Sequence, residues 1–141
     1  MKCLIIDDDF DSRHLLQKIL EPFASVSIAT DGEEGVEAFR RALKEGAPYH
    51  FITMDLMMPN FNGQDALREI REIEKELQLP ADQQVKVIII SGLDDNKETH
   101  DAFFLGGATS YIIKPIRRQM LLDELSSLGL ELGEQKKQPQ S

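Results

Sequence analysis

Residues 51–60, FITMDLMMPN, place a short apolar run directly before a single acid and a turn. Asp55 ends the run, and Pro59, Asn60 and Gly63 supply residues that favour turns. A buried strand that stops at an acid and opens into a loop puts that carboxylate at the carboxyl edge of a sheet, where ligands bind in open α/β folds. Taken alone, Asp55 is explained equally well as a helix cap or a turn acid.

Four other apolar runs share this strand pattern, and segments with helical periodicity follow all five runs. The expected strands are residues 3–6, 26–28, 51–55, 85–90 and 110–113. The expected helices are roughly residues 12–20, 31–45, 63–79, 95–106 and 121–128. Such alternation predicts right-handed crossovers and a parallel sheet covered on both faces. Of the two common strand orders, 2-1-3-4-5 suits five strands, so the predicted fold is a flavodoxin-like doubly wound (βα)5 domain.

Local signals add detail to the predicted helices. In the second helix, Asp31 with Glu34 resembles a capping box, and Glu37 can reach Arg41 four residues on. The residues able to cap the first helix are Asp9, Asp11 and Ser12. The apolar stripe expected on the first helix is Leu15, Leu16, Ile19 and Leu20. The stripe expected on the third helix is Ala66, Ile70, Ile73 and Leu77.

Composition limits the function classes. The chain has 141 residues, which fits one domain, and its net charge of −9 argues against a basic face for nucleic acid. No apolar stretch is long enough to span a membrane, and the start does not resemble a signal peptide. The single cysteine, Cys3, is expected in the core, which is consistent with a cytoplasmic setting. Residues 1–128 are expected to form the domain, and residues 129–141 a poorly ordered C-terminal tail.

Polar groups follow four of the five predicted strands: Asp7 and Asp8, Asp55, Ser91 and Lys114. In the order 2-1-3-4-5 these strands are neighbours, so their carboxyl ends meet at one edge. Clustered carboxylates repel each other, and Mg²⁺ prefers such hard oxygen ligands. The lysine adds a second positive charge, the serine adds a donor, and one carboxylate can act as a nucleophile. The set therefore suits phosphoryl transfer.

Each of these residues alone can also be a cap, a turn residue or a solvated charge. Other functional interpretations fit parts of the pattern. A haloacid-dehalogenase-type phosphohydrolase would explain Asp7-x-Asp9 and Ser91, but no acid pair follows a strand after Lys114. A flavodoxin-like FMN carrier would need a Ser/Thr-rich phosphate loop where three acids occur. Zinc is not expected, because metal-ligand spacing is lacking among His14, His50 and His100.

Several spaced motifs resemble the signature of two-component response-regulator receiver domains. They are IIDD at 5–8, Met54-Asp55 with Met58-Pro59 and Gly63, Ser91, and YIIKP at 111–115. The resemblance covers about residues 2–128. It implies that Asp55 accepts a phosphoryl group from a phosphohistidine on a sensor histidine kinase or a phosphotransfer protein. It also implies a phosphoacceptor that catalyses its own phosphorylation and dephosphorylation, and not a classical enzyme.

The resemblance assigns a metal role to the acids. Asp8 and Asp55 would bind Mg²⁺ directly, with the backbone carbonyl of Met57 as a third protein ligand. Asp7 would act mainly through a metal-bound water. A degenerate receiver that only binds partners is a weaker reading, because the acid, hydroxyl and lysine set is complete.

The resemblance assigns the remaining polar residues to the phosphoryl group and to a switch. Lys114 would contact the phosphoryl group, and Lys114-Pro115 would be a cis peptide. Ser91 and Tyr111 would form the switch that alters the fourth helix, fifth strand and fifth helix for a downstream protein target. Two features differ from a minimal receiver. The third helix looks longer than usual, and no output domain follows residue 128, which suggests a stand-alone receiver similar to the chemotaxis response regulator.

Overall fold

The computed structural model describes residues 1–56, 63–92 and 97–130. Within these ranges the chain alternates strand and helix, as the sequence predicts. The elements are β1 Lys2–Ile6, α1 Phe10–Leu20, β2 Ser25–Ala29, α2 Gly32–Lys44, β3 Phe51–Asp55, α3 Gly63–Glu76, η1 Ala81–Gln83, β4 Lys86–Ser91, α4 Lys97–Leu105, β5 Ser110–Ile113 and α5 Arg118–Ser127.

The strands form one parallel sheet in the order β2-β1-β3-β4-β5, which confirms the predicted fold class and topology. Ile6 lies opposite Met54, so Asp7 follows β1 beside the end of β3. Farther along the sheet, Asp55 lies opposite Ile90. The register therefore brings the carboxyl ends of neighbouring strands to one edge.

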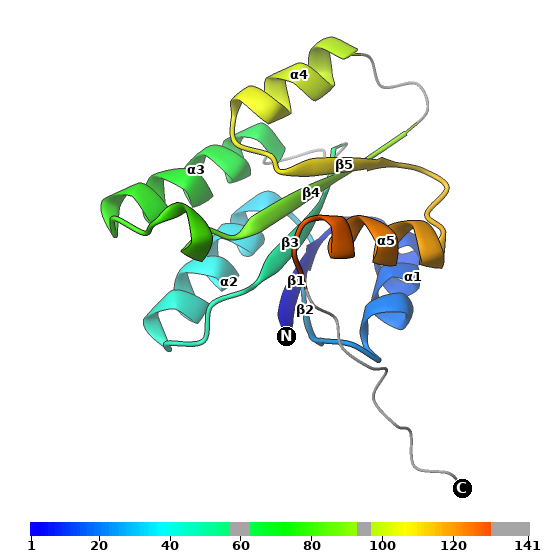
Figure 1. The fold of residues 1–141 in the computed structure, drawn as a ribbon, viewed down its shortest axis with the longest axis horizontal. Coiled ribbons are helices and arrows are strands. Elements are labelled where there is room, and N and C mark those ends of the chain that lie inside the picture. The colour runs from blue at the N-terminus through cyan, green and yellow to red at the C-terminus, as the bar shows by residue number, and fades with distance from the viewer. Residues whose placement is uncertain (57–62, 93–96, 131–141) are drawn as a thin grey trace, which may run out of the picture.

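Helices cover both faces of the sheet, as Figure 1 shows: α1 and α5 lie on one side, and α2, α3 and α4 on the other. Alternate residues of the central strands β1, β3 and β4 belong to the two cores, because successive strand side chains point to opposite faces. In β1, Ile5 packs in the core with residues of α1 and α5, whereas Ile6 packs with residues of α2 and α3. Gly35 lets α2 approach β1 closely, since a Cβ there would lie 2.4 Å from Ile6 Cδ1.

Two residues of the predicted apolar stripes are not in the core. Leu15 is 42% exposed, because α1 buries Leu16 and the adjacent residue points about 100° away around the helix. Leu77 is 55% exposed: it directly follows Glu76, the last residue of α3, and although its N–H still donates to the Ile73 carbonyl at 3.1 Å, its side chain is not covered. Both predictions were wrong because periodicity was extended one residue beyond the face that packs.

Caps and surface pairs differ in detail from the sequence patterns. Asp9 is the residue that caps α1, accepting from the Ser12 backbone N–H at 2.9 Å. Asp31 caps α2 as predicted, accepting from the Glu34 backbone N–H. The Glu34 carboxylate accepts from the Thr30 hydroxyl instead of the Asp31 backbone N–H, so only one of the two capping-box hydrogen bonds forms. The predicted pairing of Glu37 with Arg41 was wrong. The Glu37 carboxylate lies 3.4 Å from Arg40, three residues on, because i+3 neighbours share a helix face as i+4 neighbours do.

An ion pair between the half-buried Arg71 and the buried Glu74 holds α3 against the start of β4 and the turn before β5. Arg71 donates to Glu74 Oε1 at 2.6 Å and to the backbone carbonyls of Val85 and Gly107. Glu74 Oε2 accepts from the Val85 N–H at 2.7 Å. We refer to Arg71 and Glu74 as the α3 ion pair. Sequence inspection missed it, because residues three apart on a helix usually form a solvated surface pair.

The end of α5 is closed by Gly129, whose φ of +83° is typical of a glycine helix terminator. The N–H of Leu130 donates to the Leu125 carbonyl at 3.1 Å, and the Leu130 side chain is buried with the α1 and α5 core. Packed structure therefore extends to residue 130, two residues past the domain boundary drawn from sequence. The rest of the predicted tail lies outside the described residues.

Candidate phosphoryl-transfer site

Three acids meet at the carboxyl edge of the sheet. Asp7 and Asp8 follow β1, Asp55 ends β3, and one carboxylate oxygen from each lies within 4.8 Å of the others. Asp7 and Asp55 are buried, whereas Asp8 is exposed. This is the convergence that the strand ends predict, and we call these three residues the acid cluster.

Asp7 is 1% exposed and its two oxygens differ. Oδ1 accepts from the Asp9 backbone N–H at 2.9 Å, whereas Oδ2 is buried and has no hydrogen-bond partner among the described residues. The nearby Asp55 carboxylate offers it no proton when both are ionised. The pKa of the Asp7 carboxyl is raised from 3.8 to about 7, first by burial and also by the Asp55 charge, against the opposing effects of the Asp9 N–H and the Lys114 ammonium.

The acid cluster fits a hard divalent cation. Three carboxylate oxygens at close range are the ligand type that Mg²⁺ takes from proteins, and Asp7, one of the three acids, also has a buried oxygen without a donor among the described residues. A cation there would offset both the repulsion between the carboxylates and the burial of Asp7. Met57, expected to add a backbone carbonyl, lies outside the described residues.

The third of the consecutive acids, Asp9, has a different role. Its side chain caps α1, and the hydrogen bond from Ser12 lowers the pKa of the Asp9 carboxyl. The same turn supplies a contact that the sequence did not indicate: Arg13 Nη1 donates to the Asp7 backbone carbonyl at 3.1 Å. This bond fixes the backbone at Asp7, where the chain leaves β1 and enters the acid cluster.

Lys114 and Ser91 complete the predicted set. Lys114 Nζ lies 3.6 Å from Asp55 Oδ2, and the Lys114 backbone N–H donates to the Ser91 carbonyl at 2.7 Å. Ser91 is fully buried at the end of β4. The Lys114-Pro115 peptide is cis, as the sequence resemblance implies. An ammonium and a hydroxyl thus lie at the same sheet edge as the acids.

Tyr111 lies in a small cluster on the α4 side of β5 that sequence reasoning did not foresee. Its ring stacks on His100 at a centroid distance of 4.6 Å and meets Phe104 edge-on at 5.8 Å. His100 Nε2 also lies 3.2 Å from Ser91 Oγ. His100 and Phe104 are four residues apart and share a helix face, which was the signal available in the sequence. We call Ser91, His100, Phe104 and Tyr111 the α4–β5 cluster.

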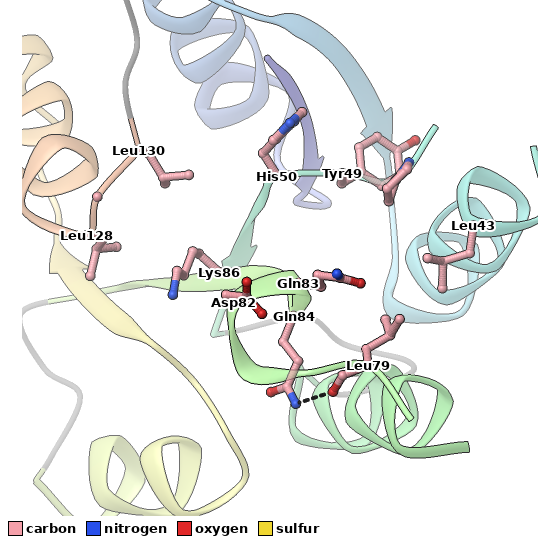
Figure 2. A pocket seen from close by; sticks show the side chains of 12 residues that line it. Leu43, Tyr49, His50, Leu79, Asp82, Gln83, Gln84, Lys86, Leu128 and Leu130 are labelled. Atoms are coloured by element: carbon pink, nitrogen blue, oxygen red, sulfur yellow. Dashed lines mark hydrogen bonds between the residues drawn. The ribbon is translucent and has the colours of Figure 1, made fainter. Parts of the chain in front are cut away.

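A pocket of about 410 Å³ lies at the amino ends of the central strands, opposite the acid cluster (Figure 2). Its lining includes His50 and Lys86 at the starts of β3 and β4, and Leu130 after α5. Gln84 beside it donates to the Leu79 carbonyl at 3.2 Å, the dashed line in Figure 2. Because β3 and β4 run from this edge to the acid cluster, the pocket is separated from the acids by the length of a strand.

Within residues 1–56, 63–92 and 97–130, no helix is both long enough and apolar enough to cross a membrane.

Residues 3–126 match the family described as the response regulator receiver domain. The chain belongs to this family. The chemotaxis protein CheY of Treponema pallidum is 33% identical over 129 residues, which covers 90% of this chain and 81% of that protein. CheY of Bacillus subtilis is 31% identical over 127 residues, covering 89% and 94%. The molecule is therefore a receiver domain of a two-component system, similar to CheY over most of its length.

Solved structures of other receiver domains share the fold. A chain in the co-crystal structure of Saccharomyces cerevisiae Ypd1, a histidine phosphotransfer protein, with the receiver domain of its response regulator Ssk1 gives a TM-score of 0.76 at 25% identity. The alignment covers 92% of this chain and 88% of that one. The receiver domain of the Arabidopsis thaliana histidine kinase CKI1, complexed with Mg²⁺ and BeF3⁻, gives a TM-score of 0.74 at 25% identity over 89% of each chain.

Proposed function

We propose that Asp55 is the phosphoacceptor of this receiver domain. The observation that carries the proposal is its position: a buried carboxylate at the end of β3, inside the acid cluster and 3.6 Å from the Lys114 ammonium. Such a group has a nucleophilic oxygen, a cationic side chain beside it and further oxygens able to hold a cation. The protein then acts as a signalling module that catalyses its own phosphorylation and dephosphorylation.

The transfer step is a substitution at phosphorus. An Asp55 oxygen attacks the phosphorus, the bond from phosphorus to the donor's histidine nitrogen breaks, and that electron pair stays on the nitrogen. A phosphohistidine on a sensor histidine kinase or a phosphotransfer protein is the donor that we propose. The similarity to the co-crystal structure of Ypd1 with the Ssk1 receiver supports this class of partner.

Asp8 and Asp55 would hold Mg²⁺ directly, with Asp7 acting through a bound water and Met57 through its carbonyl. When bound, the cation supplies positive charge for the phosphoryl oxygens. The chain's own contribution is to fix the acids: the Asp9 N–H orients Asp7, and Arg13 orients its backbone. The CKI1 receiver, a similar fold solved in complex with Mg²⁺ and BeF3⁻, supports Mg²⁺ as the cation.

Phosphorylation would be read out through the α4-β5-α5 surface. Ser91 would donate to a phosphoryl oxygen, and Tyr111 would respond to its movement. Large apolar side chains are exposed on these three elements, which is a feature of protein-binding surfaces: Phe104, Leu105, Tyr111, Ile113 and Met120. A downstream protein is therefore the proposed target.

Acetyl phosphate, a small phosphodonor, tests the phosphoacceptor directly. With Mg²⁺ present, intact mass should rise by one phosphoryl group, and Asp55→Asn should abolish the rise. Asp82→Asn, an exposed acid in η1 far along the chain from the acid cluster, is the matched control and should label like the wild type. An unlabelled wild type, or labelling that persists in Asp55→Asn, would refute the proposal.

A further inference from the structure

His100 is the one side chain of the α4–β5 cluster that contacts both proposed switch residues. Its Nε2 lies 3.2 Å from Ser91 Oγ, and its ring stacks on Tyr111 at 4.6 Å with 29° between the planes. The three residues come from β4, α4 and β5, which follow one another along the chain and lie together at this end of the molecule (Figure 1).

The contact with Ser91 has an energetic consequence because Ser91 is fully buried. A buried hydroxyl left without a partner destabilises the state in which it is unpaired. His100 supplies that partner in the form that the structure describes. In either tautomer a ring nitrogen pairs with the hydroxyl, as acceptor or as donor, so the contact fixes the position of Oγ whichever nitrogen carries the proton.

His100 also positions the ring of Tyr111. It lies between stacking on His100 and edge contact with Phe104, and it remains partly exposed. Aromatic pairs with these geometries stabilise their arrangement beyond simple burial. A movement of Tyr111 toward the space that Ser91 would leave must therefore change its contact with His100, which touches both residues.

We propose that His100 is a third residue of the switch, which holds the Ser91 hydroxyl on the α4 side and the Tyr111 ring against α4 in the unphosphorylated protein. The inference rests on the proposed function, since the group that would draw Ser91 away is a phosphoryl group on Asp55. Phosphorylation exchanges the partner of Ser91 from His100 to a phosphoryl oxygen. His100 is a positioning residue in this scheme and does not touch the reacting atoms.

Two substitutions separate the two contacts of His100. His100→Phe keeps a planar ring for Tyr111 but removes the partner of Ser91, so the unphosphorylated form alone is destabilised. Binding of BeF3⁻ with Mg²⁺ should then tighten about 2- to 10-fold, the range expected for one hydrogen bond. His100→Gln offers a hydrogen-bonding group at similar reach and should stay within about twofold of the wild type. His50→Phe, at the opposite edge of the sheet, is the control and should leave the affinity unchanged.

The affinities can be measured by titrating Mg²⁺ and BeF3⁻ while recording ¹H–¹⁵N spectra, with thermal melting to show that each variant folds. In the wild type, the imidazole ¹⁵N signals of His100 should shift on BeF3⁻ binding while those of His50 do not. This second readout needs no variant and reports on the hydrogen bond at His100 Nε2 directly.

The outcomes separate this inference from the function on which it rests. A wild type that does not bind BeF3⁻ with Mg²⁺ would overturn the proposed function and the role of His100 with it. A wild type that binds, combined with a His100→Phe variant of equal or weaker affinity, would overturn only the role of His100. Unchanged His100 imidazole signals in the bound wild type would do the same.

Discussion

Asp7 and Glu74 are equally buried carboxylates, each 1% exposed, yet their surroundings are opposite. Both oxygens of Glu74 are satisfied, one by Arg71 and one by the Val85 N–H. Asp7 has a partner for Oδ1 but none among the described residues for Oδ2, and a second acid, Asp55, lies beside it. Glu74 therefore completes a hydrogen-bond network, whereas Asp7 keeps one oxygen unpaired among the described residues.

Burial alone therefore does not identify a functional acid. A buried charge with its full set of partners is part of the fold, and removing one partner costs stability. A buried charge with an unfilled oxygen and a like-charged neighbour costs stability as it stands, which is the usual condition of a ligand site. The same type of substitution should therefore act in opposite directions at the two places.

The largest effect is expected from Arg71→Met. The substitution leaves Glu74 buried without its countercharge and leaves the carbonyl of Gly107 without its donor. We expect the free energy of unfolding to fall by about 3–5 kcal/mol, measured by urea denaturation. Arg40→Met, which breaks the exposed pair with Glu37, is the control and should cost less than about 1 kcal/mol. Equal losses in the two variants would mean that the α3 ion pair behaves like a surface pair.

Asp7→Asn should have the opposite sign. The folded-state pKa of Asp7, about 7, lies above its ordinary value of 3.8. The stability that this group contributes is therefore complete below about pH 4 and is lost as pH rises through 7. Without divalent cations, Asp7→Asn should be more stable than the wild type by roughly 2–4 kcal/mol at pH 8, with the gap closing toward pH 4.

Glu74→Gln is the matched substitution at the satisfied carboxylate. It removes the charge that faces Arg71, so it should lower the free energy of unfolding at pH 8 where Asp7→Asn raises it. Urea denaturation in a chelator at pH 4, 6 and 8 measures both variants. If the two substitutions change stability in the same direction at pH 8, the contrast between the two carboxylates is wrong.

Mg²⁺ should stabilise the protein through the acid cluster. A cation that binds only the folded state adds about 2.7 kcal/mol at a hundredfold excess over its dissociation constant. Asp8→Ala should lose the Mg²⁺-induced rise in melting temperature. Asp9→Ala is the neighbouring control: it loses the cap of α1 and some stability, yet should keep the full rise. The rise is compared and not the absolute melting temperature, because removing a repelling charge changes the stability of the metal-free protein.

Sequence reasoning predicted the fold and the acid cluster for the same physical reason. Parallel strands share one carboxyl edge, so an acid at a strand end such as Asp55 is placed as soon as the strand order is known. Asp7, Ser91 and Lys114 follow from the same rule. Each needed only the end of an apolar run to be recognised, and β-branched residues make those ends clear.

Residues outside that rule could not be found in this way. Arg71 and Glu74 look like a solvated pair until Val85 and Gly107, distant in sequence, are brought against them. His100 was considered only as a metal ligand, and its position against Ser91 and Tyr111 depends on how α4 packs, which periodicity does not specify. The prediction for the end of the third helix was wrong at Leu77 for a similar reason, because packing and not periodicity decides which residue is the last to be buried.

The smallest change in stability is expected from a substitution at Thr53. Its hydroxyl is the other buried side-chain oxygen without a hydrogen-bond partner among the described residues, and it lies on β3 two residues before Asp55. Unlike Asp7 it carries no charge and is not part of the acid cluster. Replacing an unsatisfied hydroxyl by a methyl group of similar shape is near neutral or stabilising, so Thr53→Val should change the free energy of unfolding by only about 0–1 kcal/mol, upward.

The Mg²⁺-induced rise in melting temperature should be the same in Thr53→Val as in the wild type. That outcome would show that an unsatisfied buried oxygen marks the site only when it is charged and faces other ligands, as Asp7 does. A reduced rise in Thr53→Val would place its hydroxyl in the hydration shell of the cation, and the contrast between Asp7 and Glu74 would then extend one residue farther along β3.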